Sequence, residues 1–443
     1  MIFKRKIYDK LCEWKKTSDG NSAVLIEGAR RIGKSTIAEE FAKNEYESYI
    51  LIDFTNAPKT VINLFDDISD INYIFLQLQL IYKKDLHERK SLIIFDEVQF
   101  CPKARQAIKH LVKDHRYDYL ETGSLISIKK NVKNILIPSE EKTIEMFPMD
   151  YEEFRWALKD YTTIPLLKKC FENRTSLGDE MNRRLIKDFR LYMLVGGMPK
   201  AVSTYIETNN MRLVDEEKRA ILKLYEEDFK KIDPSGKASM LFKAIPAQLE
   251  KNASRYSVSS VLKNQRNASV LELISEMESS KTVLVSYKSN DPDIGFSRTK
   301  DLENFKLFLC DIGLFTTLIF KDKDFTENII YEKLLNDKLS VNLGYLYENV
   351  VAQILKANGN NLFYYTFLNE KTKHNYEIDF LLSRKNKICP IEVKSSGYKT
   401  HASLDAFSKK YSSRILSKYV LSTKDLRKDE DVTILPIYMT MFI

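Results

Sequence analysis

The segment that most restricts the fold of this 443-residue chain is a glycine-containing loop near its N-terminus. Residues 23–27, before the loop, are an apolar run preceded by Asp-Gly-Asn, a pattern typical of a buried strand. The loop, residues 28–35, reads G-A-R-R-I-G-K-S, and the residues after it place apolar side chains on one helical face. Because strand, glycine loop and helix follow in this order, we predict an α/β fold with a parallel sheet and a phosphate-binding turn.

Each position of this loop has a chemical reason. Gly28 and Gly33 lack a Cβ, so backbone N–H groups can approach phosphate oxygens closely. Lys34 is expected to contact the β- and γ-phosphates, and the Ser35 hydroxyl to bind Mg²⁺. We therefore predict ATP and Mg²⁺ as cofactors. The residues predicted to hold the nucleotide are Gly28, Ala29, Arg30, Arg31, Ile32, Gly33, Lys34, Ser35 and Thr36.

A second apolar run, residues 91–95, ends in two acidic residues. Asp96 is placed to hold Mg²⁺ through water, and Glu97 to orient and polarise the attacking water. An Asp-Glu pair at a strand end also occurs as a simple cap or solvated turn. The loop at residues 28–35 favours the catalytic interpretation, so Glu97 and Lys34 are predicted to be catalytic.

Further strands are predicted at residues 49–54, 117–122 and 143–147, separated by helical stretches as a parallel α/β sheet requires. Thr122 or Ser124 at one strand end is a candidate sensor of the γ-phosphate, although a turn around glycine explains the same residues. Hydrolysis also uses an arginine in many such proteins, from the same subunit or from a neighbour in a homo-oligomer. The candidates, each equally compatible with an ordinary ion pair, are Arg30, Arg31, Arg105, Arg116 and Arg155.

Composition narrows the class of protein. Hydrophobic residues make up 44% and charged residues 30%, the balance of a soluble globular protein. No window approaches the roughly 18 uncharged apolar residues of a membrane span, and the N-terminus lacks a secretory apolar centre. The five cysteines are scattered without zinc or redox spacing. We therefore expect a cytoplasmic protein with reduced thiols and no membrane partner.

Five separated motifs together resemble a known family. In chain order they are residues 28–35, F-D-E-V-Q at 95–99, T-G-S at 122–124, F-P-M-D-Y-E-E-F at 147–154 and Y-M-L-V-G-G-M-P at 192–199. They resemble the prokaryotic AAA-type ATPases with a C-terminal domain of unknown function, which lie near the STAND signalling ATPases. The resemblance covers essentially the whole chain. It implies an ATPase core at 1–155, a helical lid at 156–232, a winged-helix domain at 233–322 and a C-terminal nuclease-like domain at 323–443.

Two parts of the middle region are open to more than one interpretation. The Gly-Gly-Met-Pro segment at 196–199 is either a structural junction between lid helices or a nucleotide-responsive hinge. Residues 233–309 have the order of a winged helix-turn-helix, with three helices and a β-hairpin. Its third helix carries Glu272, Glu276 and Glu278 and no Lys or Arg before Lys281, which disfavours binding in a DNA groove. A packing or regulatory role is favoured.

The C-terminal part carries a spaced set of charged residues. Glu348 lies in a predicted helix at 346–355, Asp379 enters an apolar strand at 376–382, and Glu392 and Lys394 share one face of the strand at 388–394. This set looks like the PD-(D/E)xK nuclease fold. By that resemblance, Asp379 and Glu392, assisted by Glu348, bind Mg²⁺, and Lys394 activates or positions water. All four are therefore predicted to be catalytic.

The charge around this set is basic. Residues 361–420 contain eleven Lys or Arg against five Asp or Glu. Charge alone favours a solvated face, but the coincidence of this surplus with the charged set favours DNA as a partner. The same strands also suit an ordinary solvent-facing sheet or a nuclease fold without activity. We predict an ATP-hydrolysing switch or motor coupled to a metal-dependent nuclease-like domain acting on DNA. The alternative is an ATP-gated signalling or scaffold protein whose C-terminal domain binds a partner without cleavage.

Overall fold

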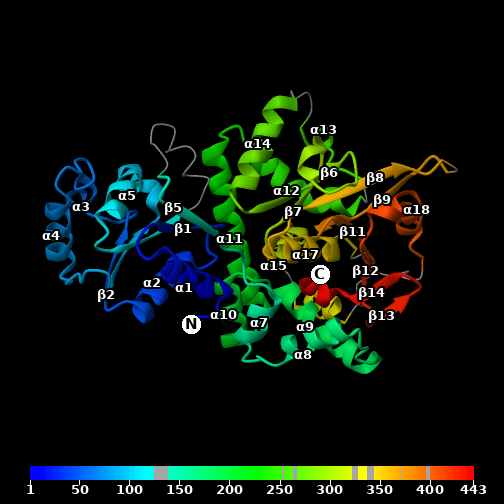
Figure 1. The fold of residues 1–443 in the computed structure, drawn as a ribbon. Helices are drawn as coiled ribbons and strands as arrows, with labels where there is room; N and C mark the ends of the chain where they lie inside the picture. The colour runs from blue at the N-terminus through cyan, green and yellow to red at the C-terminus, as the bar shows by residue number, and fades with distance from the viewer. Residues whose placement is uncertain are drawn as a thin grey trace. The chain divides into compact units, whose positions relative to one another are not determined.

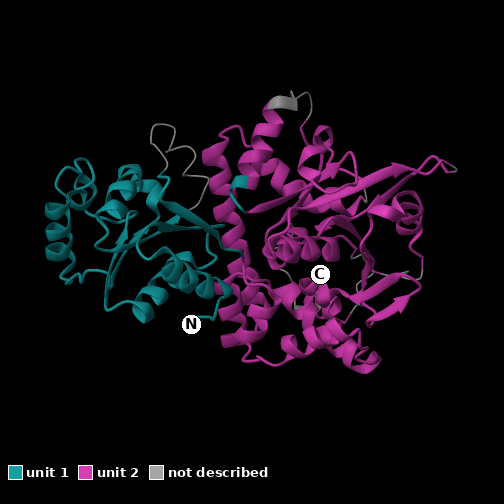
Figure 2. Ribbon diagram, viewed as in Figure 1, with its two compact units in different colours: residues 1–147, 279–281 teal, residues 148–278, 282–443 magenta. Residues whose placement is uncertain are grey.

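The computed structural model describes residues 1–123, 138–251, 254–262, 267–321, 328–336, 344–370, 372–395 and 400–443. They divide into two compact units, residues 1–147 with 279–281 and residues 148–278 with 282–443 (Figure 2). No helix among these described residues is long and apolar enough to cross a membrane.

Unit 1 is built on a five-stranded sheet in which every paired strand is parallel (Figure 1). The strands are β1 (Ala23–Glu27), β2 (Ser48–Asp53), β3 (Ser91–Asp96), β4 (Asp118–Gly123) and β5 (Glu141–Glu145), in the order β2-β3-β4-β1-β5. Its helices are α1 (Lys6–Ser18), α2 (Lys34–Glu45), α3 (Lys59–Asn63), α4 (Ile71–Tyr82) and α5 (Pro102–Asp114). The predicted parallel α/β sheet is confirmed, with β4 between the loop strand β1 and the acidic strand β3.

The strand predictions in unit 1 succeeded because these strands are buried. All residues of β3 and the first four of β1 are buried, so their apolar runs have no solvent-facing alternation. Phe54, Phe65 and Phe95 pack edge to face over this sheet, with ring centroids 5.3 to 5.9 Å apart. This packing supports β3 at the point where the acidic residues begin.

Unit 2 contains most of the helices. They are α7 (Tyr151–Ala157), α8 (Thr163–Asn173), α9 (Asp179–Val195), α10 (Pro199–Thr208), α11 (Met211–Ile232), α12 (Lys237–Glu250), α13 (Val258–Val261), α14 (Asn267–Ser279), α15 (Ile312–Ile319), α16 (Asn328–Leu335), α17 (Gly344–Ala357) and α18 (Ala402–Tyr411). The succession α12, α13, α14 and then an antiparallel hairpin agrees with the elements predicted for the middle region. The winged-helix assignment itself stays a prediction.

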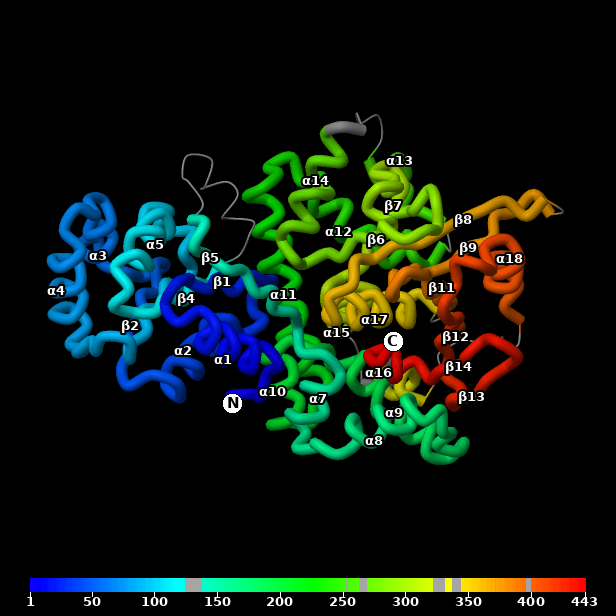
Figure 3. The backbone as a smooth tube through the Cα atoms, in the orientation of Figure 1, coloured from blue at the N-terminus to red at the C-terminus, as the bar shows by residue number. Residues whose placement is uncertain are grey.

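Two sheets complete unit 2. The first has the order β7-β6-β8-β9, from β6 (Val283–Ser289), β7 (Lys300–Leu309), β8 (Phe363–Leu368) and β9 (Asn375–Ile378). The second has the order β10-β11-β12-β14-β13, from β10 (Phe380–Arg384), β11 (Lys387–Val393), β12 (Lys418–Ser422), β13 (Arg427–Asp429) and β14 (Val432–Pro436). Because β6 pairs with β8, one sheet continues across the predicted boundary at 322/323, as the path in Figure 3 shows.

The strand predicted at residues 376–382 is two strands. β9 belongs to the first sheet and β10 to the second, and Asp379 stands between them. Its Oδ2 accepts a hydrogen bond of 2.7 Å from the backbone N–H of Val393 on β11. The apolar run continues through the break because both sheets bury it, so periodicity did not reveal the change of sheet.

The Gly-Gly-Met-Pro segment joins α9 to α10 and packs backbone to backbone. Gly197 N–H donates to Asp311 Oδ2 at 2.6 Å, and its carbonyl accepts from the N–H of Met149 at 2.7 Å. A Cβ on Gly197 would lie 2.0 Å from the Met149 carbonyl oxygen. A Cβ on Gly196, which has φ +83°, would lie 2.8 Å from the Cα of Gly313. These contacts favour the structural-junction interpretation.

Gly197→Ala should therefore lower the free energy of unfolding by at least about 2 kcal/mol, because backbone atoms must move to admit the methyl group. Chemical denaturation measures this loss. Gly236→Ala is the matched control, since Gly236 has φ +78° and no other atom within 4 Å of the added Cβ. The control should lose only about 1 kcal/mol from backbone strain. Equal losses in the two variants would contradict the close-packed junction.

Candidate functional site

The glycine loop of unit 1 connects β1 to α2 and has no room for larger residues. A Cβ on Gly28 would lie 2.3 Å from the Met146 carbonyl oxygen, and Gly33 has φ +96° at the start of α2. Ile32 is fully buried, and the guanidinium of Arg5 donates to its carbonyl at 2.9 Å. Arg5 is a loop-supporting residue that the sequence did not reveal, because it lies before α1 and outside any motif.

Lys34 lies inside this loop. Its Nζ donates to the carbonyl oxygens of Gly28 at 3.1 Å and Ala29 at 3.0 Å, and its side chain is buried. Burial lowers the pKa of Lys34, while the nearby Glu97 and Asp96 carboxylates oppose this shift. The ammonium is therefore held by neutral carbonyl groups at the position where the loop would receive phosphate oxygens.

The acidic strand end meets the loop through a hydroxyl network. Ser35 Oγ donates to Asp96 Oδ1 at 2.7 Å, and Thr122 Oγ1 donates to the same oxygen. Thr122 Oγ1 also accepts from the backbone N–H of Glu97 at 3.2 Å. The parallel pairing of β3 with β4 places these groups together. Thr122 thus holds both Asp96 and Glu97, and its sensor role stays a prediction.

Glu97 turns out of β3 with φ +53°, a conformation that residues with a side chain rarely adopt. Its carboxylate accepts a hydrogen bond from the side-chain amide of Gln99. Such backbone strain at a strand end is typical of functional positions. The amide of Gln99 therefore orients a carboxylate that sequence reasoning had already selected.

The chain's residues fit a nucleotide with Mg²⁺. The two magnesium ligands predicted here, Ser35 and Asp96, lie in direct contact, and Gly28 and Gly33 carry no Cβ that would cover the amides of the turn. Ala29 is buried in the loop, Arg30 is half-buried, and Arg31 and Thr36 are exposed. Ser124, the other sensor candidate, lies outside the described residues.

Three of the five candidate arginines are held in ion pairs. Arg105 makes a bidentate pair with Glu141 at 2.7 and 2.9 Å. Arg116 pairs with Asp114 and Arg155 with Asp160. These contacts favour a structural role for the three. A catalytic role for Arg30 or Arg31 stays a prediction.

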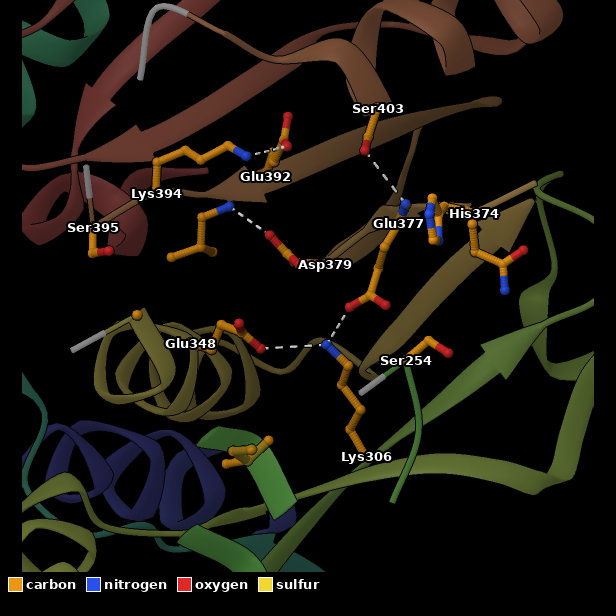
Figure 4. A pocket seen from close by; sticks show the side chains of 14 residues that line it. Ser254, Lys306, Glu348, His374, Glu377, Asp379, Glu392, Lys394, Ser395 and Ser403 are labelled. Atoms are coloured by element: carbon orange, nitrogen blue, oxygen red, sulfur yellow. Dashed lines mark hydrogen bonds and ion pairs between the residues drawn. The ribbon is translucent and has the colours of Figure 1, made fainter. Parts of the chain in front are cut away.

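The charged residues predicted in the C-terminal part line one cavity of about 490 Å³ in unit 2 (Figure 4). Glu348 comes from α17, Asp379 from the break between β9 and β10, and Glu392 from β11. Lys394 directly follows β11. The predicted convergence of these four on one pocket is therefore observed, although no two of the three carboxylates come from the same element.

Burial dominates the electrostatics of this pocket. Burial raises the pKa of Asp379 well above its ordinary value, and the neighbouring Glu348 carboxylate raises it further. Burial also raises the pKa of Glu392, whose Oε1 pairs with Lys394 Nζ at 2.7 Å. Glu392 Oε2 is buried and has no hydrogen-bond partner among the described residues. A buried carboxylate oxygen of this kind requires a further donor or cation.

Two residues of the pocket were missed by sequence reasoning. Lys306 of β7 reaches into it, and its Nζ pairs with Glu348 Oε2 at 3.3 Å and with Glu377 Oε1. Burial alone would lower the pKa of Lys306, but Glu348, Glu377 and Asp379 raise it well above its ordinary value. Glu377 was detectable, since it lies two residues before Asp379 and so on the same face of the strand predicted at residues 376–382. No pattern pointed to Lys306.

The carboxylates predicted to bind Mg²⁺ in this C-terminal pocket do not fit a metal ion as their side chains lie. Among the described residues, no three His, Cys, Asp or Glu side chains form a group able to hold one. Lys306 Nζ lies between Glu348 and Glu377 (Figure 4). The predicted Mg²⁺ site of Asp379 and Glu392, assisted by Glu348, is therefore present as residues in one pocket but is not assembled for metal.

A parallel sheet with a phosphate-binding loop after β1 and Asp-Glu after β3 defines a P-loop ATPase. Residues 20–155 match the family model of the AAA domain. Residues 186–324 and 343–440 match two domains of unknown function, DUF8612 and DUF4143. The N-terminal part of this chain is thus an AAA-type P-loop ATPase domain. No curated protein matches the chain.

Three of the solved structures that match the chain have low sequence identity to it. A Walker-type ATPase of Pyrococcus abyssi is 14% identical over 72% of this chain and 96% of its own, with a TM-score of 0.45. The ORC2 protein of Aeropyrum pernix in its ADP form is 13% identical over 75% and 95%, with a TM-score of 0.29. A DNA replication initiation factor is 14% identical over 63% and 90%, with a TM-score of 0.23. The assignment rests on the family match and the loop geometry.

Thr122→Val should lower kcat for ATP hydrolysis about tenfold to a hundredfold, because Asp96 and the Glu97 amide lose a shared partner. The KM for ATP should change less than about twofold, since the valine side chain has the same shape and touches no nucleotide-binding residue. Steady-state ATPase kinetics measures both. Thr122→Ser keeps the hydroxyl and should retain most of the activity. An unchanged kcat for the valine variant would contradict a role of Thr122 in the ATPase site.

Proposed function

We propose that this protein is an ATP-hydrolysing switch whose C-terminal pocket is a nuclease-like site for DNA. The main support for the nuclease-like site is the convergence of four charged residues on one cavity, Glu348, Asp379, Glu392 and Lys394. Glu348, Asp379 and Glu392 come from separate elements, so the convergence of the three carboxylates is not a consequence of sequence proximity alone. The ATPase half is supported by the AAA family match and the loop geometry.

In ATP hydrolysis, the chain's own groups bind and orient the reactants. The loop amides and the N-terminus of α2 bind phosphate oxygens. The Lys34 ammonium leaves the carbonyl oxygens of Gly28 and Ala29 and donates to phosphate oxygens instead. Ser35 and Asp96 would hold Mg²⁺, which would neutralise charge on the phosphates. Glu97, oriented by Gln99, positions water for attack on the γ-phosphate.

Glu97→Gln should lower ATP turnover by about a hundredfold to a thousandfold while ATP still binds, because the amide positions water poorly and accepts no proton. Phosphate release and retention of labelled ATP on the protein measure the two effects. Glu88→Gln, at an exposed position of unit 1, is the matched control and should behave as wild type. Full turnover in Glu97→Gln would exclude Glu97 as the residue that positions water.

The arrangement around the C-terminal pocket supports a nuclease-like site. β10 and β11 are antiparallel, and β11 then pairs in parallel with β12 after the α18 crossover. α17 with Glu348 precedes this sheet, so the helix Glu, the Asp and the Glu-x-Lys pair follow in the order that the resemblance to PD-(D/E)xK nucleases implies. The basic surplus of residues 361–420 suits a phosphate backbone. Lys394, held by Glu392, is the residue proposed to position water.

A second candidate function is favoured by one specific observation. Lys306 pairs with Glu348 and Glu377, and in this arrangement the described carboxylates form no metal-binding group. This state suits a pocket that recognises a protein partner under ATP control without cleaving DNA. The two functions differ in whether purified protein cuts DNA.

If the pocket is a nuclease, Asp379→Asn and Lys394→Ala should each abolish DNA cleavage and leave ATP hydrolysis within about twofold of wild type, because both residues lie outside the ATPase domain. Linear, nicked and branched DNA with Mg²⁺ or Mn²⁺, with and without ATP, are the substrates. Asp429→Asn, on the exposed strand β13, is the control and should cut normally. Absence of cleavage by the wild-type protein under all conditions would favour the partner-binding function.

A further inference from the structure

Lys306 is a charged residue of the C-terminal pocket that comes from an earlier part of the chain, as do its neighbours Leu249 and Ser254. It lies on β7, within the segment 186–324, whereas the carboxylates it meets lie within the segment 343–440. Its Nζ lies 3.3 Å from Glu348 Oε2 and also pairs with Glu377 Oε1. Its side chain is only 6% exposed, so both ion pairs are shielded from water.

The ammonium of Lys306 lies between two of the carboxylates that line the pocket. The pocket contains four carboxylates, from Glu348, Glu377, Asp379 and Glu392, and two lysines. Lys394 pairs with Glu392, whereas Lys306 pairs with Glu348 and Glu377 on the other side of the pocket (Figure 4). A divalent ion close to a fixed ammonium would meet strong repulsion in a buried site. The Lys306 pairs therefore compete directly with metal for Glu348.

The backbone around Lys306 is anchored, which places any movement in its side chain. The Leu309 N–H donates to Asn349 Oδ1 at 2.9 Å, and Asn349 Nδ2 donates back to the Leu309 carbonyl at 3.1 Å. These bonds join the end of β7 to α17 beside Glu348. The flexible four-carbon stem of a lysine allows its ammonium to leave while the strand stays in place.

We propose that Lys306 is a built-in cation that closes the C-terminal pocket to divalent metal until its side chain leaves Glu348 and Glu377. The inference rests on the proposed nuclease-like function and adds its regulation. The controlling residue belongs to the middle region, so a partner or conformational change that withdraws Lys306 opens the pocket. Glu392 Oε2, buried without a hydrogen-bond partner among the described residues, is then available to an entering cation.

The test is the binding of Mn²⁺ to the full chain without nucleotide, by titration calorimetry. Lys306→Met, which keeps the length and removes the charge, should bind Mn²⁺ at least about tenfold more tightly than wild type. Lys306→Arg keeps the charge and should bind no more tightly than wild type. All three proteins share the same P-loop, so any binding there cancels in the comparison. Equal affinity of Lys306→Met and wild type would overturn the proposal.

Removing a buried ammonium leaves Glu377 without its partner, so a second pair of variants keeps the test valid if Lys306→Met fails to fold. Glu377→Gln and Lys306→Met/Glu377→Gln differ only in the lysine charge. The double variant should bind Mn²⁺ at least about tenfold more tightly than Glu377→Gln. Equal binding by these two proteins would also overturn the proposal.

DNA cleavage by the same proteins separates this inference from the proposed function. Tighter Mn²⁺ binding by Lys306→Met together with faster Mn²⁺-dependent cleavage supports both. Tighter Mn²⁺ binding without cleavage by any protein supports the role of Lys306 and contradicts the nuclease function. Cleavage by wild type with unchanged Mn²⁺ affinity in Lys306→Met supports the nuclease and overturns the role of Lys306.

Discussion

A buried charge must be paired or hydrogen-bonded, and this constraint determines how both pockets of the protein are built. In the ATPase domain, the buried ammonium of Lys34 is held by the carbonyls of Gly28 and Ala29. In the C-terminal pocket, the buried ammonium of Lys306 is held by Glu348 and Glu377. Each pocket thus contains a buried lysine, and the groups that hold its ammonium determine which ligand can replace it.

The two lysines differ in the charge of their partners, and this difference has a chemical consequence. Lys34 contacts neutral carbonyl oxygens. An anionic phosphate is a stronger hydrogen-bond partner and attracts the ammonium away from these carbonyls. Lys306 contacts carboxylates, so only another cation can replace it there. The first arrangement is suited to receiving a nucleotide, and the second to excluding a metal until the lysine moves.

Contacts between segments far apart in the chain hold unit 2 together. Gly197 approaches the backbone of Met149 too closely for any side chain, and Asp311 receives the Gly197 amide. Likewise β6 of the middle region pairs with β8 of the C-terminal part, so both parts contribute to one sheet. For this reason the middle region is able to place Lys306 in a pocket whose carboxylates all come later in the chain.

The sequence alone determined the elements and the local motifs of this protein. Strands β1 to β4 were predicted to within one or two residues, because their buried apolar runs and flanking polar residues are local signals. The loop at residues 28–35 and the pair Asp96-Glu97 were found by spacing, as were Asp379, Glu392 and Lys394. Glu377 shared the same two-residue spacing and was detectable, although it was overlooked.

Only the tertiary structure decided which distant residues meet these motifs. Thr122 reaches Asp96 and Glu97 because β4 pairs in parallel with β3, and local periodicity contains no information on strand order. Lys306 precedes Glu348 by 42 residues and meets it only because β7 and α17 pack together. Local sequence patterns specify which face of an element is apolar, but the choice of partner depends on packing across the whole unit.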